Sequence, residues 1–267
     1  MKRISAKHMN SVFLSAGAIA LAFTTLLTQA TEKAHGPKKD IQHLFLQKKM
    51  ANTGVIADAK GDVKIHANLQ SKGKKQDVDI KVKGLEASAA YLLFARVDDD
   101  TNSTQVAEFS TDAEGKASIE LREKGKSKSD KGHTRLPLPA ALNPVSGIRE
   151  LLILDGNEQA VLTADLSSPD KLEYLLKRDL STGDIKASLQ IEAKEKNAKV
   201  RLEASGLSPN SDYSLALNGS VAQTGTTDEH GKLELKTELE HPLDILSLAT
   251  VDLMDSAGTV VASTTLP

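Results

Sequence analysis

Apolar and polar residues alternate along several stretches of this chain, and the period of two is its first structural signal. Residues 63–69, 78–82, 185–191 and 200–204 all follow this pattern. Alternation places one face of a strand on an apolar core and the other in water. The pattern predicts an all-β, antiparallel protein. In the second half we expect seven strands, near residues 185–191, 199–204, 213–217, 221–226, 232–237, 246–254 and 260–265.

The chain contains an internal repeat. Gly61-Asp62-Val63-Lys64 recurs 122 residues later as Gly183-Asp184-Ile185-Lys186. Gly84-Leu85 and Tyr91 recur at the same offset, and Thr111-Asp112-x-x-Gly115-Lys116 recurs as Thr227-Asp228-x-x-Gly231-Lys232. Residues 45–54 also echo residues 174–183. An ordered set of matches of this kind indicates two copies of one structural unit.

Seven short strands separated by turn residues are typical of a two-sheet sandwich. We therefore predict two tandem antiparallel β-sandwiches, the first over residues 44–168 and the second over residues 169–267. The first unit carries two insertions, near 98–103 and at 122–135, and both are expected to project as loops. Ser168-Pro169-Asp170 is compatible with the start of a short helix, but the echo of residues 45–54 favours an edge strand there.

Specific turn residues support this division. Asn218-Gly219 predicts a tight hairpin in which both residues have positive φ, and residues 255–258 predict another hairpin. Gly115 and Gly231 are expected at positive φ. Asp112 and Asp228 are expected to cap the same turns through hydrogen bonds from backbone N–H groups.

Each unit contains a motif that resembles a known family. Leu207-x-Pro209-x-x-x-Tyr213 follows Gly206 and is similar to the tyrosine corner of fibronectin type III and related immunoglobulin-like domains. Leu85-x-Ala87-x-x-x-Tyr91 is the same pattern without the proline, and the Trp of fibronectin type III domains is absent. The resemblance implies an immunoglobulin-like fold in which Tyr91 and Tyr213 are structural. Because Pro209 restricts φ, we expect the second corner to be the better ordered.

The N-terminal residues resemble a secretory signal peptide. Lys2, Arg3 and Lys7 precede an apolar run at 12–27, and Thr28-Gln29-Ala30 offers small residues for cleavage. The alternative is a retained anchor, but a spanning helix needs about 20 apolar residues. We predict that residues 1–30 are removed, that residues 31–43 form a flexible segment, and that the mature protein is soluble in the periplasm or secreted, without a membrane span.

Composition narrows the chemistry. The 267 residues include no Cys and no Trp, and the formal net charge is -2. Without Cys there are no disulfides, thiolate metal sites or Cys nucleophiles. The charge gives no reason to expect nucleic acid as a partner. The histidines lack the spacing of a metal site, so we expect no metal and no cofactor.

Two surface segments are candidates for binding. Asp98, Asp100 and Asn102 place oxygen ligands at alternate positions and form a weak candidate for Ca²⁺, although a solvated turn explains them as well. The run at 122–135 carries Lys124, Lys126, Lys128 and Lys131. Its composition predicts a mobile basic loop that would contact an anionic partner.

These features favour a non-enzymatic binding or structural module whose partner is an envelope or extracellular protein or a polysaccharide. The alternative is an envelope- or matrix-associated protein that docks an anionic surface through residues 122–135. The third hypothesis is a hydrolase whose catalytic residues do not form a recognisable local motif in the sequence.

The first prediction concerns export. Expression with an intact N-terminus, followed by mass spectrometry of the exported protein, should show a mature chain that begins near Thr31. An exported protein that retains residues 12–27 would show that this segment is an anchor.

Overall fold

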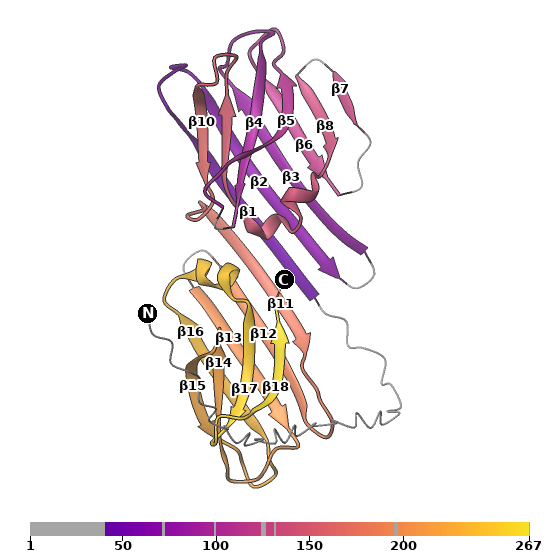
Figure 1. Cartoon of the computed structure of the whole chain (residues 1–267), viewed down its shortest axis with the longest axis vertical. Helices are drawn as coiled ribbons and strands as arrows, with labels where there is room; N and C mark the ends of the chain where they lie inside the picture. Colours follow the sequence, from indigo (N-terminus) through magenta and orange to yellow (C-terminus); the bar gives the residue numbers. More distant parts are fainter. Residues whose placement is uncertain are drawn as a thin grey trace, which may run out of the picture. The chain divides into compact units, whose positions relative to one another are not determined.

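The computed structural model describes residues 41–266, apart from residues 71–72, 99, 124–126, 131 and 195–196 (Figure 1). The predicted signal peptide lies outside the described residues, as does most of the predicted flexible segment. The described chain is all-β and belongs to one compact unit. Its described helical residues lie in three 3-10 turns: η1 (Ala140–Leu142), η2 (Val145–Gly147) and η3 (Pro242–Ser247).

The described residues of the first repeat form ten strands. They are β1 (Ile41–Asn52), β2 (Lys60–Gln70), β3 (Gly73–Lys83), β4 (Ala90–Val97), β5 (Thr104–Ser110), β6 (Ala117–Arg122), β7 (Lys128–Asp130), β8 (His133–Pro137), β9 (Ile148–Leu154) and β10 (Ala160–Asp165). The second repeat contains β11 (Lys171–Asp179), β12 (Lys186–Lys194), β13 (Asn197–Ser205), β14 (Asp212–Leu217), β15 (Ser220–Thr226), β16 (Leu233–Leu239), β17 (Thr250–Asp255) and β18 (Val260–Thr265). The strand predicted after Pro169 is confirmed by β11, but its predicted place at an edge is wrong, because β11 pairs with β12 on one side and with β1 on the other.

One long sheet runs through both repeats in the order β16-β13-β12-β11-β1-β2-β3-β6-β8-β7. The two repeats meet in the antiparallel ladder between β1 and β11, which starts at the pair Ile41 and Lys177. The first three residues of β1 were predicted to be flexible, but they belong to this ladder. In the second repeat, β15-β14-β17-β18 form a separate sheet.

The first repeat differs from the expected pair of separate sheets. Ala51 and Asn52, at the end of β1, pair with β10, and β10 continues through β9 and β4 to β5. β5 in turn lies against β6 and β8. The long strand β1 therefore belongs to both layers. Because β1 joins the two layers, the strands of the first repeat form one curved, nearly closed sheet.

Strand pairing also corrects the alignment of the two repeats at their first strands. Lys48 pairs with Val63, and Thr182 pairs with Ile185, the equivalent of Val63. Lys48 and Thr182 are therefore equivalent, and the sequence echo that matched Phe45 with Tyr174 is out of register. Phe45 points away from the core whereas Tyr174 is buried. The longer connection between β1 and β2 accounts for the shift.

The core follows the predicted alternation. Val63, Ile65, Val78 and Ile80 are fully buried, and the intervening residues of β2 and β3 face outward. We call the opposite, polar side of the long sheet its outer face. In the second repeat the predicted strands are confirmed, except that η3 occupies the beginning of the segment expected at 246–254.

The tyrosine corners are present in both repeats. The hydroxyl of Tyr91 accepts a hydrogen bond from the N–H of Glu86 at 3.0 Å, and the hydroxyl of Tyr213 accepts one from Ser208 at 3.2 Å. Thr111 completes the first corner because its Oγ1 donates to the carbonyl of Glu86 at 2.6 Å. Thr227 makes the equivalent bond in the second. The backbone of one residue in each repeat, Glu86 or Ser208, is therefore held at both its N–H and its C=O.

The turns beside these corners also behave as predicted. Asp112 Oδ1 accepts hydrogen bonds from two backbone N–H groups, and Asp228 does the same. Gly115 and Gly231 have φ of 71° and 70°. A Cβ at either position would lie 2.1 Å from a carbonyl oxygen, of Leu85 or of Leu207. Glycine is therefore required at both positions, because φ is positive and because a side chain would collide with the neighbouring carbonyl oxygen.

The basic insertion is not a simple loop. It contains β7 and β8, and β8 pairs with β6 in parallel, so the segment extends the long sheet by two short strands. The ion pair between Glu120 on β6 and Arg135 on β8 helps to hold this segment against the sheet.

The second prediction concerns the corners. Tyr91→Phe and Tyr213→Phe should each reduce the free energy of unfolding by about 0.5–1.5 kcal/mol, because each removes one hydroxyl that satisfies a backbone N–H. Urea denaturation measures the loss. Tyr174→Phe provides a comparison outside the corners and should lose less, because its hydroxyl accepts only a long side-chain hydrogen bond, of 3.5 Å, from Gln42. Unchanged stability in both corner variants would contradict the structural role.

Candidate functional site

The residues singled out for Ca²⁺ are engaged locally. Asp98 forms an ion pair with Arg149 at 3.6 Å, and Asp100 Oδ1 accepts a hydrogen bond from the N–H of Asn102 at 2.9 Å. Asp98 has φ of 49° and begins the turn between β4 and β5. These contacts suit a stabilised hairpin turn.

The basic insertion is held by one carboxylate. Glu120 on β6 pairs with Arg135 at 2.7 Å and with Arg122 at 3.1 Å, and His133 lies 3.9 Å away. The hydrogen bond from Arg135 is the main cause that lowers the pKa of Glu120. Of the lysines proposed to meet an anionic partner, Lys128 is exposed on β7. Lys124, Lys126 and Lys131 lie outside the described residues.

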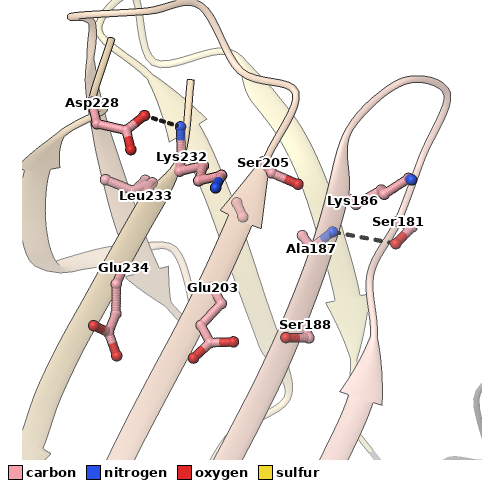
Figure 2. Close-up of a pocket in the computed structure, with 11 residues that line it drawn as sticks. Ser181, Lys186, Ala187, Ser188, Glu203, Ser205, Asp228, Lys232, Leu233 and Glu234 are labelled. Carbon is pink, nitrogen blue, oxygen red and sulfur yellow. Dashed lines mark hydrogen bonds between the residues drawn. The ribbon is translucent and has the colours of Figure 1, made fainter. Parts of the chain in front are cut away.

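The two repeats carry pockets at equivalent positions, which the sequence analysis did not find. Lys81, Val82 and Lys83 line the pocket of the first repeat, and their equivalents Glu203, Ala204 and Ser205 line that of the second. Both pockets also include the Asp-x-x-Gly-Lys turn. Figure 2 shows the second-repeat pocket. There the carboxylate of Asp228 accepts a hydrogen bond from the backbone N–H of Lys232, and the hydroxyl of Ser181 accepts one from the backbone N–H of Ala187. The cavity volumes are about 700 Å³ in the first repeat and about 550 Å³ in the second.

The first-repeat pocket is basic. Five lysines line it, and none of them makes an ion pair with a described carboxylate: Lys49, Lys60, Lys81, Lys83 and Lys116. Its two acidic residues are engaged, since Asp62 accepts a hydrogen bond from Gln47 at 2.9 Å and Asp112 caps its turn. Met50, Val82 and Ala117 supply apolar surface. The five lysine ammonium groups are therefore available to a ligand.

The second-repeat pocket has the opposite character. Glu203 and Glu234 lie opposite each other on β13 and β16, and their carboxylates lie on the same face (Figure 2). Arg201 forms ion pairs with both. The hydrogen bonds from Lys236 and from Arg201 lower the pKa of Glu234. The charges of these two glutamates are thus compensated by cations of the protein.

A second polar group lies on the outer face of the first repeat. His66 on β2 is directly opposite Asp77 on β3, and Asp79 follows two residues later on the same face. Their ligand atoms all lie within 4.8 Å of one another. Burial raises the pKa of Asp79, and the neighbouring carboxylates of Asp77 and Glu120 raise it further. Histidine spacing within the sequence could not find this group, because two of its three members are aspartates on the neighbouring strand.

No protein-family model matches this chain, and none of the curated proteins searched matches it either. Within the described residues, no helix has the length and apolar character needed to cross a bilayer.

The third prediction concerns Glu120. Since its pKa is lowered in the folded protein, its contribution to stability is complete above the ordinary glutamate value of about 4.3 and is lost as the pH falls through the lowered pKa. Glu120→Gln should therefore reduce stability near pH 7 by about 1 kcal/mol and have little effect near pH 2. Urea denaturation across this range measures the difference.

Glu108→Gln is the matched control, because Glu108 is exposed on β5. A loss for Glu120→Gln that does not change with pH would contradict the ion-pair role of Glu120.

Proposed function

We propose that this chain is an exported, non-enzymatic binding module of two immunoglobulin-like repeats, whose first repeat binds an anionic ligand in its lysine-lined pocket. The duplicated tyrosine corner supports the immunoglobulin-like assignment. So do the two four-stranded layers of the second repeat, β16-β13-β12-β11 and β15-β14-β17-β18. Export rests on the signal-like N-terminus.

The observation that carries the ligand class is the excess positive charge of the first-repeat pocket, which has five lysines against Asp62 and Asp112. Unpaired lysines around a concave surface attract anions and retain them by charge-assisted hydrogen bonds. Lys49 and Lys81 flank Asp62 directly across neighbouring strands. Strands are about 4.8 Å apart, so these two lysines emerge about 10 Å from each other. This spacing suits a ligand that carries more than one anionic group, such as an acidic polysaccharide.

This pocket supports an anionic partner better than the basic insertion does. Arg122 and Arg135 are committed to Glu120 and hold the insertion against the sheet. The pocket lysines have no such partner among the described residues. The anionic ligand class is therefore retained, and its contact surface moves from residues 122–135 to the pocket.

The fourth prediction exchanges the two pockets. Lys81→Glu combined with Lys83→Ser installs the residues of the second repeat in the first, and should weaken binding of dextran sulfate by at least about tenfold. Glu203→Lys combined with Ser205→Lys should increase binding, because it builds the basic pair in the second repeat. Titration calorimetry in about 0.15 M salt measures both, and higher salt should weaken the interaction.

Two controls isolate the pocket from net charge. Lys194→Glu combined with Lys177→Ser makes the same change of charge at exposed positions outside both pockets, and should leave affinity within about twofold. Uncharged dextran should not bind. Equal losses in the pocket variant and in the control variant would show that dextran sulfate responds only to overall charge, and would refute the pocket.

A further inference from the structure

The polar group on the outer face of the first repeat has the composition and proximity of a metal site. Cross-strand pairing sets His66 against Asp77, and the strand period returns Asp79 to the same face. The ring of Phe45 lies against His66 with 4.9 Å between centroids, which restricts the imidazole. One imidazole nitrogen and two carboxylates, all within 4.8 Å, can converge on one ion by small rotations of their side chains.

The carboxylates of this group lack partners inside the protein. Asp77 is only 8% exposed, and no hydrogen bond or ion pair joins its side chain to another described residue. Asp79 Oδ1 is buried without a hydrogen-bond partner, and so is the side-chain oxygen of Asn68, two residues from His66. A buried carboxylate without a partner is costly. The charges of Arg122 and His66 offset that cost only in part, since the pKa of Asp79 stays raised, and a bound cation would offset it further.

Two cations lie directly across from this pair, Lys64 opposite Asp79 and Arg122 opposite Asp77. The charge of Arg122 acts to lower the pKa of Asp79, but neither cation forms an ion pair with the two aspartates. Arg122 is directly opposite Asp77 on β6, but its guanidinium pairs with Glu120 at 3.1 Å. In the second repeat the equivalent positions hold cations that are paired with glutamates. Lys199, the equivalent of Asp77, forms an ion pair with Glu238 at 3.0 Å, and Arg201, the equivalent of Asp79, pairs with Glu234. The first repeat thus has two carboxylates at positions where the second repeat has two cations.

We infer that His66, Asp77 and Asp79 bind a divalent transition-metal ion, with zinc as the best match. An imidazole nitrogen with two carboxylate oxygens satisfies three positions of a tetrahedral zinc site and leaves the fourth for water or a ligand atom. Calcium prefers six to eight oxygen ligands, so this set disfavours it. The inference is independent of the anionic-ligand pocket, since it uses none of the pocket residues.

The fifth prediction tests this site on the mature chain, after treatment with EDTA and dialysis. Titration with ZnCl₂ should give one saturable site, and Zn²⁺ should raise the thermal midpoint by mass action. Co²⁺ should give the visible absorption of a tetrahedral complex. His66→Ser, which installs the equivalent Ser188, and Asp77→Asn should each weaken zinc binding by at least about tenfold. CaCl₂ should not compete.

His43→Ser is the matched control, since it removes another histidine from the outer side of β1, and it should keep zinc affinity within about twofold. Far-ultraviolet circular dichroism of the metal-free variants reports folding. If Asp77→Asn does not fold, His66→Ser decides the outcome. Zinc affinity that is unchanged in His66→Ser, or is lost equally in His43→Ser, would overturn the site.

Discussion

The ladder between β1 and β11 is the interaction on which the rest of the arrangement depends. It joins the first strands of the two repeats by main-chain hydrogen bonds, and it pairs Gln42 with Leu176. Counted from the equivalent pair Lys48 and Thr182, these are themselves equivalent positions, so the ladder is centred on matching points of the two copies. It also covers two strand edges that would otherwise be open to other chains. Burial beside this ladder raises the pKa of Tyr174 to about 12, which keeps its hydroxyl neutral.

The two repeats share a framework and differ in surface chemistry. The corner of Tyr91 and Thr111 recurs at Tyr213 and Thr227 with the same hydrogen bonds, because each closes the same backbone turn. Side chains on the outer face are under no such constraint. Lys81 and Glu203 occupy equivalent positions with opposite charges. Duplication has kept what the backbone requires and has varied what a ligand would contact.

Charged side chains on the outer face of the first repeat are less fully paired than those at equivalent positions of the second repeat. At equivalent places the second repeat pairs its charges, as in Lys199 with Glu238, whereas Asp77 and the pocket lysines of the first repeat form no ion pair with another described residue. Polar groups that are poorly satisfied within a protein often belong to sites that a ligand completes. The proposed anion pocket and the proposed metal site therefore rest on the same kind of evidence, at separate places on one face.

The sequence by itself determined the strands, the repeat, the tyrosine corners and the capped turns, because alternation and turn chemistry act over short distances. It did not determine that β1 would join two layers, nor that the basic insertion would add strands, because those outcomes depend on pairing between distant segments. The candidate sites show the same limit. His66 and Asp77 are 11 residues apart, and only the register of β2 against β3 sets them face to face. The lysine pocket gathers residues from five segments, and tertiary structure alone decides which charges meet there.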